Sequence, residues 1–191
     1  MSETNLESRN SLPPELKFLL EQHPRETWRS GQLKGLGRTW LAIHGNFRDT
    51  VTRMSAQLDA VRETGTFAPA FAGRFAHEAS GLLGHLNAHH AIEDDHYFPI
   101  FQHAEPRLVR GFEIMDADHH VIHDAIERFA GEGNQFLQKI GRAEGAPDAA
   151  QSFAVDRMAE ELSGFTRLLR QHLADEEDLV IPLILEKAEL G

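Results

Sequence analysis

Two segments of the chain place a histidine four residues before a glutamate. The first segment runs from His89 to Glu93 and the second from His172 to Glu176, and a proline follows each glutamate after six residues, at Pro99 and at Pro182. In an α-helix, side chains four positions apart project from the same face, because 3.6 residues complete one turn. Each His-Glu pair can therefore hold one cation between its two side chains.

Three more histidines extend this pattern to four segments of the chain. His119 and His123 repeat the four-residue spacing, and His44 stands alone on an earlier segment. Four segments that each offer such side chains are typical of a metal centre inside a helix bundle. The candidate ligands are five imidazoles and two carboxylates: His44, His89, Glu93, His119, His123, His172 and Glu176.

This ligand set has room for two metal ions. If both carboxylates bridge and an oxo or hydroxo group adds a third bridge, two octahedral ions retain one open position, where dioxygen or a related diatomic molecule could bind. Imidazoles together with bridging carboxylates favour a di-iron pair, and zinc or manganese fits the same ligand types. We therefore expect two iron ions as the cofactor.

Composition excludes several other classes of protein. The 191 residues fit one domain of ordinary size. A net charge of -11 argues against nucleic acid or an anionic membrane as the main partner, and the absence of cysteine excludes thiolate sites and iron–sulfur clusters. No apolar run approaches the roughly 18 residues of a membrane helix, and the N-terminus lacks the regions of a signal peptide, so we expect a cytoplasmic protein.

Hydrophobic periodicity predicts an all-α fold. Apolar residues recur at intervals of three and four over about residues 33–61, which indicates a long helix. Turn signals divide the rest of the chain into further long helices at about 69–98, 107–140 and 148–189, and an amphipathic run at Glu15–Gln22 indicates a short accessory helix. Successive histidine groups lie equally far from turn signals at Phe67, Pro106 and Pro147. We therefore predict an up-down-up-down four-helix bundle over residues 33–191, after an N-terminal extension of residues 1–32 whose first twelve residues are loose.

The histidine and carboxylate segments resemble the hemerythrin-like (HHE) cation-binding family over about residues 36–188. The resemblance implies a four-helix bundle with a non-haem di-iron centre, and it carries ligand roles to His44, His89, Glu93, His119 and His172. It favours Glu176 as the carboxylate of the fourth helix and keeps Glu177 as an alternative, because the oxygen-carrying members place that carboxylate five residues after the histidine. His123 matches a second histidine on the third helix of those carriers.

Other histidines have a plainer interpretation. His90 and His120 lie about 100° around the helix from their neighbours, so we interpret them as flanking groups. His85 and His96 are near the ligand stripe and could orient a ligand by a hydrogen bond.

The leading hypothesis for function is binding or sensing of dioxygen or a related diatomic molecule, rather than catalysis. The alternatives are a di-iron redox enzyme acting on peroxide, nitric oxide or oxygen, and an iron-sequestering protein. The sequence leaves open the protein partner, if any, and the oligomeric state.

Overall fold

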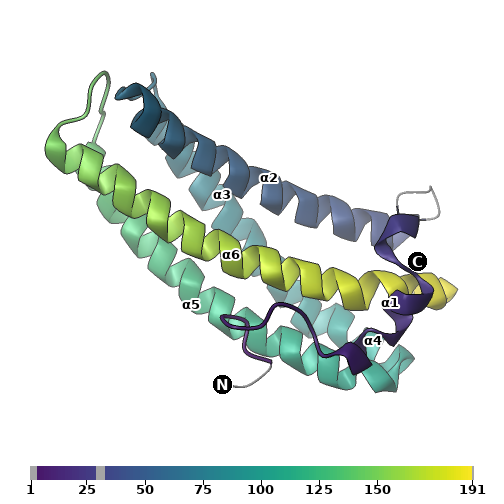
Figure 1. The fold of residues 1–191 in the computed structure, drawn as a ribbon. Coiled ribbons are helices and arrows are strands. Elements are labelled where there is room, and N and C mark those ends of the chain that lie inside the picture. The colour runs from purple at the N-terminus through teal and green to yellow at the C-terminus, as the bar shows by residue number, and fades with distance from the viewer. Residues whose placement is uncertain (1–3, 29–32, 191) are drawn as a thin grey trace. The chain divides into compact units, whose positions relative to one another are not determined.

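The computed structural model describes residues 4–28 and 33–190, and over these residues the protein is helical (Figure 1). No strand occurs in these two ranges apart from one isolated bridge between Phe67 and Gly145. No helix in the described part of the chain is both long and apolar enough to cross a membrane. The helices are α1 (Phe18–Gln22), α2 (Gly35–Thr64), α3 (Phe71–Ile92), α4 (Phe98–Ala104), α5 (Val109–Ile140) and α6 (Ala149–Glu186), with a π-helical turn at Glu93–Tyr97 between α3 and α4.

The predicted turn signals all lie in connections between helices. Phe67 follows α2, Pro106 begins a short 3₁₀ segment before α5, and Pro147 precedes α6. Two of the helix ends use glycine in the left-handed region, Gly65 after α2 and Gly141 after α5, where a side chain would be strained. The prediction of an all-helical chain is confirmed.

The chain divides into two compact units. Unit 1 comprises residues 1–46, 89–121 and 168–191, and unit 2 comprises residues 47–88 and 122–167. Each of the helices α2, α3, α5 and α6 contributes residues to both units, and every candidate ligand except His123 belongs to unit 1.

Unit 1 includes the N-terminal segment, and the expectation that residues 1–12 are loose is wrong for the part that the structure describes. Leu6, Arg9 and Leu12 are buried. Leu12 and the later leucines of the segment share one apolar cluster with Phe98, Phe112 and the C-terminal turns of α6. Apolar residues spaced along this segment therefore fold it against unit 1, which a count of its polar residues did not predict.

The core of unit 2 combines aliphatic side chains with several phenylalanines that contact one another. The rings of Phe71 and Phe75 stack with centroids 5.9 Å apart, and Phe75 meets Phe136 edge-on at 5.3 Å. Phe129 and Phe165 stack at 5.3 Å. Offset and edge-to-face pairs of this kind add to the free energy of apolar burial.

Candidate metal centre

A change of helix type occurs where the ligand segment of α3 ends. The peptide N–H of Phe98 donates to the carbonyl of Glu93, five residues back, so this turn is wider than an α-helical turn. Pro99 explains the change, because it has no N–H to donate and its ring would clash with the carbonyl four residues before it. Single π-helical turns are common at functional sites, and this one begins at a candidate ligand.

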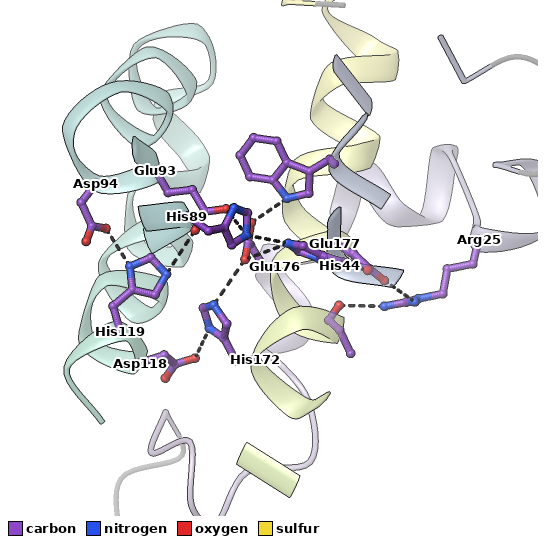
Figure 2. Close-up of polar contacts among 12 residues, drawn as sticks. Arg25, His44, His89, Glu93, Asp94, Asp118, His119, His172, Glu176 and Glu177 are labelled. Atoms are coloured by element: carbon purple, nitrogen blue, oxygen red, sulfur yellow. Dashed lines mark hydrogen bonds and ion pairs between the residues drawn. The ribbon is translucent and has the colours of Figure 1, made fainter. Parts of the chain in front are cut away.

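One group of ligand atoms combines α2, α3, the π-helical turn and α6 (Figure 2). His44 Nε2 is 3.1 Å from His89 Nε2, which in turn is 2.8 Å from Glu93 Oε1. Glu176 Oε2 lies 3.6 Å from His44 Nε2. The ligand atoms of these four buried residues all lie within 4.8 Å of one another, a spacing that one cation could span.

A second group consists of three histidines, His90, His119 and His172, and their ligand atoms also lie within 4.8 Å of one another. The rings of His90 and His119 stack with centroids 4.0 Å apart. Glu93 Oε2 is 3.6 Å from His119 Nε2, and Glu176 Oε2 is 3.3 Å from His172 Nε2. Both carboxylates therefore approach both groups.

Several buried polar atoms of the two groups have no hydrogen-bond partner. They are His90 Nε2, both carboxylate oxygens of Glu93, His119 Nε2, His172 Nε2 and Glu176 Oε2. A buried polar atom without a partner costs about 1 to 3 kcal/mol, and more if it is charged. Because these atoms are the ones a cation would contact, the residues fit a metal centre on the chemistry of their donor atoms.

Hydrogen bonds fix the opposite side of three of the imidazoles. The Nδ1 atoms of His44, His119 and His172 lie 3.0 Å from Glu177 Oε1, 2.8 Å from Asp94 Oδ1 and 3.4 Å from Asp118 Oδ2, respectively (Figure 2). A carboxylate on Nδ1 leaves Nε2 free to bind a metal, and it orients the ring and raises its basicity.

Trp40 holds one of the carboxylates from the side. Its indole N–H donates to Glu176 Oε1 across 2.7 Å, which leaves Glu176 Oε2 directed at the histidines. The indole ring also lies 6.0 Å from the ring of His89, between centroids. The carboxylate is therefore held in place before any ligand binds.

Burial and neighbouring charge set the protonation of the metal-free site. Burial lowers the pKa of His89 to about 4 and raises the pKa of Glu93 well above its usual range. Burial also opposes ionisation of Glu176, but the neighbouring His44 and His172 hold its pKa well below the usual range. Burial opposes protonation of His172, but the neighbouring Asp118 and Glu176 raise its pKa to about 9. A neutral imidazole and an ionised carboxylate are the forms that bind metal, so both His172 and Glu93 must release a proton when a cation binds.

Comparison with known protein families supports a cation site built from His and Glu side chains on several helices. Residues 36–184 match the family described as the hemerythrin HHE cation binding domain. The chain belongs to this hemerythrin family. Comparison with curated proteins and with solved structures gave no significant match. Membership confirms the resemblance seen in the sequence and indicates a protein that binds metal cations, with two His/Glu groups that could hold them.

The structure places the predicted ligands of this hemerythrin domain unequally. It brings together His44, His89, Glu93, His119, His172 and Glu176. His123 does not join these residues. Its side chain is 58% exposed, and its Nε2 atom lies 3.5 Å from Glu127 Oε1, one turn further along α5. Between the two carboxylate alternatives, Glu176 faces the histidines, whereas Glu177 accepts from the far side of His44.

His90 takes the place that sequence reasoning gave to His123. His90 is buried and belongs to the second histidine group, whereas His85, His96 and His120 are exposed. Four-residue spacing selects one face of each helix for ligands, and His90 lies about 100° around the helix from that face. Adjacent histidines at the end of a ligand helix were the available signal, because two metal positions can use two directions from one helix.

Proposed function

We propose that this hemerythrin domain binds two iron ions and that its reduced form binds dioxygen or a related diatomic molecule, as a carrier or a sensor. One observation carries the proposal. Five buried imidazoles surround two buried carboxylates that each approach both histidine groups. A carboxylate placed in this way suits a bridge between two metal ions, whereas a site for one ion would need only one of the groups.

The residues divide between two metal positions. One position would be held by His44 and His89 and the other by His90, His119 and His172, with Glu93 and Glu176 shared between them. Five nitrogens and two bridging carboxylates fill most of the roughly twelve positions of two octahedral ions, which leaves room for solvent and a small ligand. When bound, the iron pair supplies the redox-active position at which a diatomic molecule can bind.

The chain's own residues favour binding over oxidation of organic substrates. Carboxylates are few and imidazoles many, in contrast to the carboxylate-rich di-iron bundles. Glu176 is fixed by Trp40, and the imidazoles of His44 and His172 are fixed by carboxylates on Nδ1, so these ligands are held in one arrangement. Full burial of His44, His172 and Glu176 keeps bulk water away from the centre.

Anaerobic loading with iron(II) tests this function. We expect two iron ions per chain, and we expect absorption bands of an iron pair to appear on oxygen titration with one dioxygen consumed per site and little peroxide released. Rapid consumption of oxygen, nitric oxide or peroxide over many cycles would instead support the redox enzyme. Iron uptake without any response to diatomic molecules would support sequestration.

Alanine substitutions test the ligand assignment. His89→Ala and His172→Ala should remove most of the bound iron, whereas His77→Ala in unit 2 should leave it unchanged. His90→Ala against His123→Ala is the sharper pair, because the sequence and the structure rank these two residues in opposite order. Elemental analysis of each purified variant decides, and iron loss with His123→Ala but not with His90→Ala would overturn our assignment.

The proposal includes a bundle of up-down-up-down topology over residues 33–191, with residues 1–32 as an extension. Its support is that the ligands of α2, α3, α5 and α6 gather in one cluster while the turn signals lie between these helices. An experimental structure of the iron-loaded chain tests this arrangement.

A further inference from the structure

Two arginines of the N-terminal segment contact carboxylates that hold candidate metal ligands. Arg9 and Arg25 lie before residue 36, where the match to the hemerythrin family begins. Both belong to unit 1, together with the centre. Their targets, Asp118 and Glu177, are the carboxylates on the Nδ1 side of His172 and His44.

Arg9 is a buried cation that donates four hydrogen bonds. Its side chain is 1% exposed, and its two terminal nitrogens reach the two oxygens of Asp118 as a fork, with Nη1 donating across 2.7 Å. Its Nε donates to Asp175 Oδ2 across 2.8 Å, and Nη1 also donates to the carbonyl of Thr4. Such a two-pronged contact fixes the plane of the carboxylate as well as its charge. Asp118 can therefore meet His172 in only one orientation.

Arg25 contacts the carboxylate beside His44 through a single hydrogen bond. Its Nη1 donates to Glu177 Oε2 across 3.3 Å, while Glu177 Oε1 lies 3.0 Å from His44 Nδ1 (Figure 2). Further bonds to Asp178 Oδ1 and to the carbonyl of Ala174 hold the guanidinium against α6. The orientation of Glu177, and through it that of His44, is thus fixed from the N-terminal segment.

Apolar contacts dock the segment that carries these arginines. Leu12, Leu16, Leu19 and Trp28 are buried in one cluster with α4 and with the end of α6. In Figure 1 the segment is purple, and its helix α1 lies at the yellow end of α6. Arg25 also lies 5.1 Å from the centre of the Trp28 ring, a cation–π contact. The segment is therefore packed into unit 1 along much of its length.

We propose that residues 4–28 form an outer layer of the metal centre, in which Arg9 and Arg25 are positioning residues that orient His172 and His44 and make the bound iron easier to reduce. The inference rests on the proposed function. A carboxylate on Nδ1 makes an imidazole a stronger donor, and an arginine on that carboxylate offsets the effect. A positive charge near a poorly solvated centre also disfavours the more highly charged ferric state.

The third imidazole provides an internal contrast. His119 Nδ1 pairs with Asp94, whose side chain is 34% exposed and has no arginine partner within residues 4–28 and 33–190. Two of the three imidazole–carboxylate pairs thus receive an arginine, and both arginines come from outside the family domain. Within the described residues, the N-terminal segment thus places a positive charge beside the carboxylates that contact His44 and His172, but not beside the carboxylate that contacts His119.

Glutamine substitutions test the inference in the full-length, iron-loaded protein. Arg9→Gln and Arg25→Gln remove one charge each, and Arg107→Gln is the matched control. Arg107 also pairs with a buried carboxylate of unit 1, Glu105 at 2.7 Å, but that carboxylate contacts no candidate ligand among the described residues. The measurements are iron per chain, the midpoint potential by absorbance-monitored redox titration, and the rate of iron(II) loss to a chelator.

We expect the two test variants to retain iron but to lower the midpoint potential by about 59 mV or more, a ten-fold change in the ratio of iron(II) to iron(III) for one electron. Iron(II) loss should become about ten-fold faster. The Arg107→Gln control should match the wild type. Arg9→Lys and Arg25→Lys keep the charge but lose the directed hydrogen bonds of the guanidinium group, so they should recover the potential more fully than the rate.

An unchanged potential and an unchanged rate in Arg25→Gln would overturn the inference. That variant decides even if Arg9→Gln fails to fold, because the Arg25 side chain is 42% exposed, whereas that of Arg9 is 1% exposed, so its replacement disturbs the packing less. Failure of the wild-type chain to take up iron would refute the proposed function instead, and the outer-layer role would fall with it.

Discussion

Unit 1 and unit 2 bury different kinds of side chain, although the same four helices contribute to both. Among the described residues, the buried charged and histidine side chains all lie in unit 1, and the one buried polar side chain of unit 2 is Thr50. Unit 2 instead buries stacked phenylalanines such as Phe129 and Phe165. A continuous helix can therefore pass from a core stabilised by apolar burial to a core whose polar groups need a cation to satisfy them.

Removal of the metal should produce the largest difference between the units. Without the metal, unit 1 keeps buried histidines and carboxylates that have no cation to bind. A cation present at a thousand times its dissociation constant contributes about 4 kcal/mol to stability. We expect a clear and reversible fall in melting temperature and a loss of amide hydrogen-exchange protection in residues 89–121 and 168–190. Residues 47–88 should keep most of theirs. Equal melting temperatures with and without metal would show that the polar cluster is hydrated rather than buried.

A substitution that creates a cavity in unit 2 should have the opposite effect, lowering stability without loss of iron. Phe165 is fully buried and stacks on Phe129. Phe165→Ala should cost about 3 to 5 kcal/mol of unfolding free energy by denaturant titration, because it removes a ring from a packed core. Iron per folded chain should stay at the wild-type value, and Phe153→Ala, at a 61% exposed position, is the control. Loss of iron in step with loss of stability would mean that the centre depends on the packing of unit 2.

Glu177 sharpens the comparison within unit 1. Because it holds His44 and, in our assignment, does not bind the metal, Glu177→Gln should weaken metal affinity about 10- to 100-fold without abolishing binding. Glu176→Gln should cost more, since it changes a proposed bridging ligand. Competition with a chelator of known affinity measures both. If Glu177→Gln proves the more damaging, then Glu177 is the ligand, as in the alternative that the sequence left open.

Replacement of Glu105 should have the smallest effect on stability, because this buried carboxylate of unit 1 contacts no candidate metal ligand among the described residues. The hydrogen bonds from Arg107 lower the pKa of Glu105 to about 2. A lowered pKa contributes stability above the unfolded value near 4.5, and the contribution is lost as the pH falls from there toward 2. Since Arg107 is 67% exposed, Glu105→Gln should cost less than about 1 kcal/mol at pH 7, with unchanged iron. Thermal melts between pH 7 and pH 2.5 should show the difference from wild type shrinking with acid, and a constant difference would contradict this cause.

The helices could be predicted because their signals are local. Apolar residues at intervals of three and four located α2, and the turn signals near Phe67, Pro106 and Pro147 marked where the later helices begin or end. The π-helical turn at Glu93–Tyr97 could not be predicted in the same way, because the periodicity does not register one extra residue in one turn. Its only local signal was Pro99, which on sequence alone indicates the end of a helix.

The candidate site was less predictable, since its assembly depends on directions across helices. Spacing along one helix selected His123, but one turn beyond His119 the side chain is exposed. The same reasoning set aside His90, which points to the second histidine group. The role of Arg9 had no sequence signal, because its partners Asp118 and Asp175 lie more than 100 residues away.

The hydrogen bond from Trp40 to Glu176 has an optical consequence. The chain has only two tryptophans, Trp28 and Trp40, and both belong to unit 1. Tryptophan fluorescence from this protein therefore originates beside the metal centre and its N-terminal cover, and none of it comes from unit 2. Iron bound within reach of the Trp40 ring would quench that emission, so the protein carries its own fluorescent reporter of metal occupancy, without any added label.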